Sequence, residues 1–133
     1  MSLEFGEQIP RLVLEMAYLN MKMGSMPQAQ VFLEAAQTLR PQDPTPPMFM
    51  GMWHFAQGQY GDAERSYRQV LQQHADHDLT RAFLAETLIA QRRWAEAETL
   101  LNGIVKGDRD AAAVTFANEL LSGMKLGVFQ RVS

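Results

Sequence analysis

The sequence of 133 residues contains no cysteine. Disulfide bonds and thiol chemistry are therefore excluded, which fits a reducing compartment. The sequence also has no excess of basic charge, because 12 lysines and arginines stand against 15 acidic residues, for a net charge of -3. A protein that binds nucleic acid normally presents a basic face to the phosphates, so this composition argues against a nucleic-acid partner.

Long apolar runs are also missing. No run reaches the length needed to cross a membrane, and Glu4 and Glu7 stand where a secretory leader would carry positive charge. We therefore expect a protein that is neither exported nor inserted into a membrane. At this length we expect a single domain over residues 1–133, with a core of modest size.

Methionine, in contrast, is abundant, with nine residues, and several lie in or beside residues 48–56. This segment reads Met-Phe-Met-Gly-Met-Trp-His-Phe-Ala. A surface helix normally keeps one polar face, whereas a helix of this segment is apolar on every face. The segment is too short to span a membrane, so protein must cover it on both sides. If the rest of the chain covers only one side, the other side is a binding groove.

An offset of 34 residues aligns the chain with itself three times. The aligned columns hold residues of matched size, namely Ala17, Gly51 and Ala85; Gly24 and Gly58; Met26, Tyr60 and Trp94; Ala29, Ala63 and Ala97; and Leu33, Tyr67 and Leu101. A helical hairpin explains the pattern, because small residues let two helices approach closely and a glycine ends the first helix with positive φ.

This spacing resembles the tetratricopeptide repeat over about residues 10–109. The resemblance implies an all-α fold in which three helical hairpins stack as a short right-handed solenoid. The repeats would cover about residues 10–43, 44–77 and 78–109, followed by a capping helix at about 110–125. The third unit carries Arg92 where the turn glycine is expected, so we expect a less tight turn there.

Seven helices are expected in detail. They run from Phe5 or Ile9 to Met23, then over Pro27–Leu39, Pro46–Gln57, Gly61–His74, Leu79–Arg92, Ala95–Lys106 and Asp110–Lys125. Four prolines within residues 41–47 separate the second helix from the third. We expect Thr45 to cap the third helix and Asp76 or Asp78 to cap the fifth. Residues 128–133 are expected to fray.

The first helix of every unit lines the concave side of such a stack. Residues four and seven positions apart share a helix face, and this spacing predicts a peptide-binding groove of Leu14, Tyr18, Met21, Met48, Phe49, Met52, Phe55, Phe83, Glu86 and Ile89. The opposite faces are expected to form the core, from Val13, Met16, Ala17, Met50, Gly51, Leu84, Ala85 and Leu88. Flexible methionines favour a groove that adapts to apolar partners. The alternative is that the concave residues are further core, covered by a neighbouring helix or a second copy.

The predicted groove lacks the basic and amide residues with which some tetratricopeptide proteins hold a chaperone's C-terminal carboxylate. We therefore expect an apolar ligand. His74, Asp76, His77 and Asp78 are the cluster that most resembles metal ligands, but an exposed loop with a helix cap is the simpler interpretation. His54 is expected on the core side of its helix, with no nucleophile indicated near it. We expect no enzyme activity, no cofactor and no metal.

Residues 49–52, 57–67, 84–88 and 94–98 resemble the small tetratricopeptide chaperones of bacterial type III secretion. Members of that family are cytoplasmic three-repeat proteins that hold secreted translocator or needle subunits in the groove. The resemblance implies a virulence-associated chaperone or adaptor with a protein client, and it leaves a homodimer open. The alternative is a scaffold for a bacterial envelope or pilus complex that uses its convex face or a terminal helix.

Overall fold

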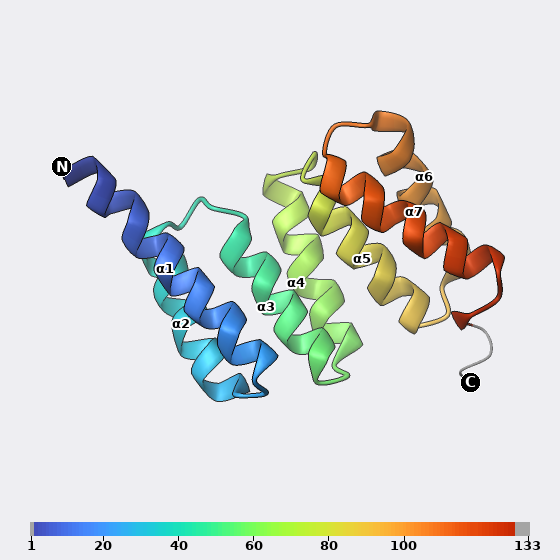
Figure 1. The fold of residues 1–133 in the computed structure, drawn as a ribbon. Coiled ribbons are helices and arrows are strands. Elements are labelled where there is room, and N and C mark those ends of the chain that lie inside the picture. Colours follow the sequence, from blue (N-terminus) through green and yellow to red (C-terminus); the bar gives the residue numbers. More distant parts are fainter. Residues whose placement is uncertain (1, 130–133) are drawn as a thin grey trace.

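The computed structural model describes residues 2–129, with side chains at Ile9 and from Arg11 onward. This part of the chain forms seven α-helices and no strand (Figure 1). The helices are α1 (Ser2–Lys22), α2 (Met26–Leu39), α3 (Thr45–Ala56), α4 (Tyr60–Gln73), α5 (Asp78–Ala90), α6 (Trp94–Gly107) and α7 (Ala111–Lys125). The predicted all-α fold is confirmed.

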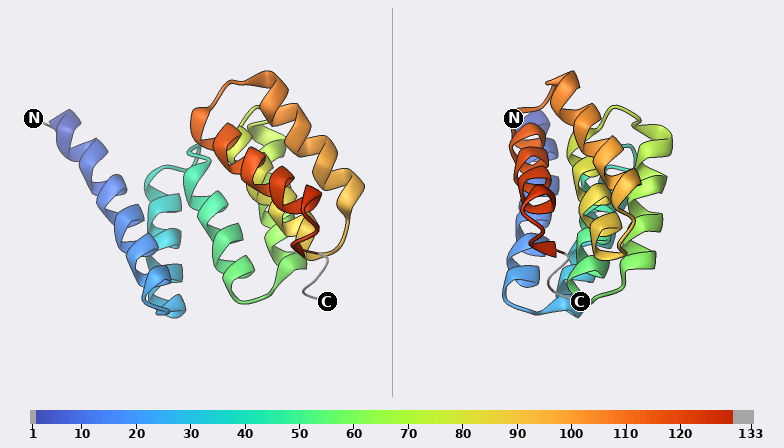
Figure 2. Two further views of the ribbon diagram at one scale, coloured as in Figure 1. Left: turned by 45° about the vertical axis from the view of Figure 1, so that its right-hand side comes forward. Right: turned by 90° about the vertical axis from the view of Figure 1, so that its right-hand side faces the viewer.

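Three hairpins stack along the molecule, made of α1 with α2, α3 with α4, and α5 with α6. Helix α7 follows them and packs on α5 and α6, where a capping helix is expected (Figures 1 and 2). Among residues 2–129, no helix is both long and apolar enough to span a membrane.

The small residues of the repeat lie where two helices touch. Ala17, Ala29, Ala63 and Ala97 are fully buried. Gly51 shows the reason most directly, since a Cβ atom built on it would lie 2.3 Å from Cε1 of the Tyr67 ring. Side-chain volume at this position would push α3 and α4 apart, so the glycine is required for their close approach.

All three hairpins turn through a residue with positive φ. Gly24 has φ +78° and Gly58 has φ +76°, and Arg92 adopts φ +64° at the corresponding place in the third hairpin. The amide of Arg93 donates to the Leu88 carbonyl at 2.8 Å, and the matching bonds of the glycine turns measure 2.8 and 2.9 Å. The expectation of a looser third turn is wrong, because Arg92 accepts the left-handed conformation that glycine takes elsewhere.

Two of the predicted helix caps are also wrong. Helix α3 begins at Thr45, and the preceding Asp43 accepts the Thr45 amide at 2.9 Å through its carboxylate. Helix α5 has no side-chain cap, and Asp78 lies inside its first turn. Asp110, in contrast, caps α7 by accepting two backbone amides at 3.0 and 3.2 Å, which satisfies donors that the helix itself leaves free.

The main core lies between the second and third hairpins and α7. Its fully buried large side chains include Tyr67, Leu84, Leu88, Leu101 and Ile104. The buried residues of the first hairpin, such as Ala17 and Leu33, form no part of this cluster. Met16, predicted as core, is 43% exposed, so that prediction is wrong.

The chain after α7 folds back on that helix. The Phe129 ring lies where a side chain on Gly123 would project, since a Cβ there would meet Phe129 Cε2 at 2.6 Å. Residues 128–133 were expected to fray. Val128 and Phe129 of this segment instead belong to the part of the chain that folds back on α7. Residues 130–133 lie outside the described part of the chain.

Candidate protein-binding groove

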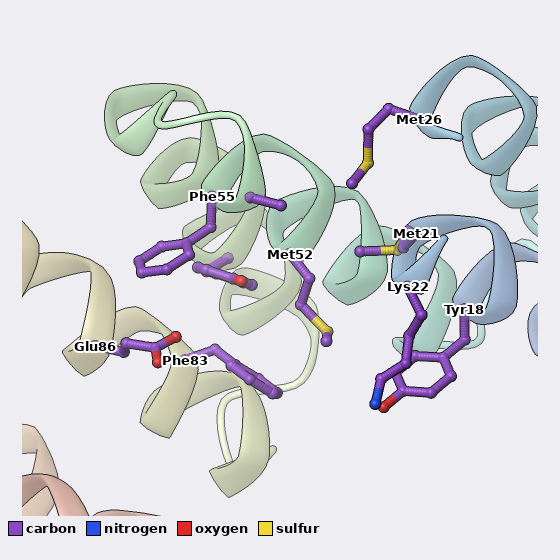
Figure 3. Close-up of a pocket in the computed structure, with 10 residues that line it drawn as sticks. Tyr18, Met21, Lys22, Met26, Met52, Phe55, Phe83 and Glu86 are labelled. Carbon is purple, nitrogen blue, oxygen red and sulfur yellow. The ribbon is translucent and has the colours of Figure 1, made fainter. Parts of the chain in front are cut away.

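A groove separates the first hairpin from the helices that follow it (Figure 3). It has a volume of about 300 Å³, and the end of α1 and the start of α2 face α3, α4 and α5 across it. The lining residues are Tyr18, Met21, Lys22, Met26, Met52, Phe55, Ala56, Tyr67, Phe83 and Glu86. This volume is near the lower end of the roughly 300–1,000 Å³ typical of ligand pockets, so it suits a few side chains of a partner.

One hydrogen bond fixes the first hairpin against α3. The indole Nε1 of Trp53 donates to the Met26 carbonyl oxygen at 2.9 Å. A further aromatic contact joins Tyr18 of α1 to Phe49 of α3, with ring centroids 6.2 Å apart. These contacts set the distance between the two walls of the groove.

Six of the ten residues predicted for the groove line it: Tyr18, Met21, Met52, Phe55, Phe83 and Glu86. Leu14 and Phe49 lie beside Tyr18 in an adjoining hollow of about 420 Å³, together with Arg11 and Glu15. Their role in binding a peptide stays a prediction.

Met48 and Ile89 do not lie at the groove surface. They are only 3% and 5% exposed, and both belong to the main core cluster. Ala82, one helical turn before Glu86 on α5, is fully buried as well. Helix spacing assigns a residue to a face, but it does not say how far the neighbouring helices cover that face.

The prediction missed four lining residues: Lys22, Met26, Ala56 and Tyr67. Met26 and Tyr67 occupy bulky positions of the repeat, which we assigned to packing between helices. That assignment holds for Tyr67 against Gly51, yet this ring also reaches the groove. Lys22 and Ala56 each directly follow a predicted residue, at the ends of α1 and α3. Helix spacing therefore did not place them on the predicted face.

The charged and polar groups of the groove are few. Burial raises the pKa of the Glu86 carboxyl to about 7. Burial also raises the pKa of the Tyr67 hydroxyl, and the nearby charge of Glu86 raises it further. The Lys22 ammonium lies 5.5 Å from the centroid of the Tyr18 ring, on the wall opposite Glu86 (Figure 3). The groove is therefore apolar except for a few polar groups set apart from one another.

His54 lies at the end of α3 and is half-buried, rather than being part of the core. Its Nδ1 shares a hydrogen bond with Gln59 Oε1 at 2.8 Å, and its ring meets the edge of Trp53 at 4.8 Å between centroids. The hydrogen bond to Gln59 spans the turn between α3 and α4, whereas the contact with Trp53 lies within α3.

The two aspartates of the histidine and aspartate cluster form ion pairs with arginines. Asp78 is buried and accepts from Arg109 at 2.7 and 3.0 Å and from Arg81 at 3.0 Å. Arg109 also pairs with Asp76 at 3.0 Å. Hydrogen bonds from Arg109 are the largest cause that holds the pKa of Asp78 below its usual value. These bonds join the first turn of α5 and the loop before it to the loop before α7. Within residues 2–129, no group of three His, Cys, Asp or Glu side chains is placed to hold a metal.

Comparison with known proteins gives one family. Residues 54–117 match the model of the tetratricopeptide repeat family, which covers the end of α3 through the middle of α7. No curated protein matches the sequence. Tetratricopeptide repeats generally mediate protein–protein interaction, and the fold is generally non-enzymatic. The stacked hairpins and the family match over residues 54–117 together support a fold of the tetratricopeptide-repeat kind.

Proposed function

We propose that this protein is a chaperone or adaptor that holds an apolar segment of a client protein in the groove between the first hairpin and α3–α5. The observation that carries the proposal is the apolar lining, since Tyr18, Met21, Met26, Met52 and Phe55 surround one groove. An apolar surface of this kind usually marks an interaction site.

The shape and composition of the groove suit a protein segment. Met21, Met26 and Met52 extend into it from three different helices (Figure 3). Methionine has three rotatable bonds and a polarisable sulfur, so these walls can repack around apolar side chains of different shape. The protective mechanism is occlusion, in which the client's aggregation-prone segment is kept from water and from other chains.

The resemblance of residues 49–52, 57–67, 84–88 and 94–98 to type III secretion chaperones supports a more specific form of the proposal. In that form the client is a secreted subunit, and the protein acts in the bacterial cytoplasm before secretion. The groove would then keep the subunit from assembling too early.

The experiment is a charge substitution in the groove. A client segment is first selected from a library of peptides displayed on phage, synthesised with a fluorescent label, and measured by anisotropy. Met52→Glu combined with Phe55→Glu should abolish binding, because two carboxylates would have to be desolvated against the client's apolar side chains. Circular dichroism should show unchanged helicity.

The matched control is Val31→Glu combined with Leu39→Glu, which adds the same charge at exposed apolar positions of α2 outside the groove. This control should bind the peptide as the wild type does. Binding retained by the groove variant, or lost equally in both variants, would refute the proposal.

A second candidate function is an assembly scaffold, and one observation favours it. Five apolar residues of the first hairpin are 43–63% exposed and alternate three and four positions apart, namely Ile9, Leu12, Met16, Leu19 and Met23. This spacing is the one through which helices pair side by side. Leu12→Glu with Leu19→Glu should disrupt such an assembly while peptide binding in the groove persists.

A further inference from the structure

The Tyr67 hydroxyl is a buried polar group without a partner. Tyr67 is 0% exposed, and its oxygen forms no hydrogen bond within the described residues. Buried hydroxyls in folded proteins nearly always have a partner, so an unpaired one calls for an explanation. Because Tyr67 also lines the groove, a group that enters the groove can supply the missing bond.

Glu86 is the second such group. It extends from α5 into the same groove, where Phe55 and Phe83 are its neighbours (Figure 3). No hydrogen bond or ion pair joins its carboxylate to any residue between Ile9 and Phe129 whose side chain is described. The Lys22 ammonium lies instead beside the Tyr18 ring on the opposite wall.

Other buried or half-buried acidic residues of the described chain have partners, which are backbone amides for Asp43 and Asp110 and arginine side chains elsewhere. Asp78 binds Arg109 and Arg81, and Glu64 binds Arg68 and Arg93 at 2.9 Å. A carboxylate held among aromatic rings without a cation is costly, since it loses hydration and gains no compensating bond. Glu86 therefore departs from the way the rest of the chain treats its shielded acids.

We propose that the groove selects an apolar client segment that carries a lysine or arginine, whose cationic group donates hydrogen bonds to Glu86 and to the Tyr67 hydroxyl oxygen. The inference rests on the proposed function and adds the chemistry of the partner. Lysine and arginine have several donors on one charged group, so a single side chain can satisfy both oxygens.

The surroundings favour an amino-acid cation over a free ion. A bound divalent metal needs several oxygen ligands, whereas Glu86 is the only carboxylate among the groove's described lining residues. The walls around it are methionine and aromatic side chains, which suit the aliphatic stem of lysine or arginine. A segment with apolar residues on either side of that cation would fill the rest of the groove.

The test uses labelled peptides that differ at one position. The apolar peptide selected above is synthesised with lysine, arginine, norleucine or glutamate at its central position and titrated against the full chain at pH 8. The lysine and arginine peptides should bind about tenfold more tightly than the norleucine peptide, as expected for one charge-assisted hydrogen bond. The glutamate peptide should bind most weakly.

Two variants connect this preference to the groove. Glu86→Gln should bind the lysine and norleucine peptides with equal affinity, and Tyr67→Phe should reduce the preference for lysine by about threefold. Glu119→Gln, an exposed acid on α7, serves as the control and should keep the full preference.

The outcomes separate the two proposals. If the norleucine peptide binds the wild type as tightly as the lysine peptide, the groove binds apolar segments but the inference is overturned. The inference is also overturned if the Glu86→Gln variant still binds the lysine peptide more tightly than the norleucine peptide. If no peptide binds the wild type, or if all four still bind the variant with Met52→Glu and Phe55→Glu, the proposed function fails and the inference fails with it.

Discussion

Replacing Glu86 with glutamine should stabilise the free protein, and the size of the effect should depend on pH. Burial raises the pKa of this carboxyl from 4.5 to about 7. The folded state therefore binds a proton more tightly than the unfolded chain, so the wild-type carboxylate lowers stability progressively as pH rises from about 4.5 to about 7. Each pKa unit corresponds to about 1.4 kcal/mol. The penalty above pH 7 is then on the order of 3 kcal/mol as an upper estimate, since Glu86 is half-buried and partly solvated.

Thermal unfolding followed by circular dichroism measures this penalty directly. At pH 8 the Tm of Glu86→Gln should exceed that of the wild type by roughly 5 to 10 °C for a domain of this size. Near pH 4.5 the two values should converge, because the wild-type carboxyl is then protonated in the folded state. Tyr18, Lys22 and Tyr67 are the other titratable groups that line the groove, and none is bonded to Glu86.

Glu119→Gln provides the control, since it removes the same charge from an exposed position on α7. It should change Tm by only a small amount at either pH. A stabilisation by Glu86→Gln that is equal at pH 4.5 and pH 8 would refute the reasoning. So would a wild type that is the more stable of the two at pH 8.

Three further predictions concern the fold. Arg92→Gly should raise the free energy of unfolding, measured in urea, by about 0.5 to 1 kcal/mol, because glycine takes the positive φ of that turn without strain. A loss of stability would show that the arginine side chain contributes more to stability than its backbone strain costs. Gly51→Ala should lower the free energy of unfolding by about 1 to 3 kcal/mol, because the alanine Cβ would overlap the Tyr67 ring. An unchanged unfolding midpoint would contradict the close packing of α3 on α4. Asp78→Ala should lower the free energy of unfolding by about 2 kcal/mol through the lost charge-assisted bonds to Arg109. Glu119→Ala, at an exposed position of α7 outside these ion pairs, should change it little.

The architecture could be predicted from the sequence because it depends on local spacing. The 34-residue period placed small residues opposite bulky ones, and Gly51 packs against Tyr67 as that pattern requires. The seven helices follow from the same period and from the prolines between α2 and α3. Most helix ends differ from the prediction by one or two residues, whereas α1 begins at Ser2, before both predicted starts, Phe5 and Ile9.

The exceptions have physical causes that span the chain. Arg92 stands at a turn where the hydrogen bonds of the hairpin impose positive φ, and the sequence alone shows only the absence of glycine. Asp78 and Arg109 lie 31 residues apart and meet only when the third hairpin closes. Such contacts leave no periodic signal in the sequence.

The lining of the groove was predicted only in part, because helix spacing gives the face of a residue but not what covers that face. Tyr18, Met52 and Phe55 were found because helix spacing gives their faces. Met48 and Ile89 share a predicted face with groove residues, yet neighbouring helices cover them. The second role of Tyr67, as packing and as groove lining, appears only when three helices are placed together.

The most direct test of the central claim is a methyl NMR titration of the protein labelled at its nine methionines. Unlabelled lysine-containing peptide is added to the full chain, and each methionine signal is assigned by substitution. The methyl signals of Met21, Met26 and Met52 should shift. Those of Met16 and Met23, which belong to the exposed apolar row of Ile9, Leu12, Met16, Leu19 and Met23 in the first hairpin, should stay unchanged. Shifts confined to Met16 and Met23 would place the partner on that row and contradict the groove as the binding site.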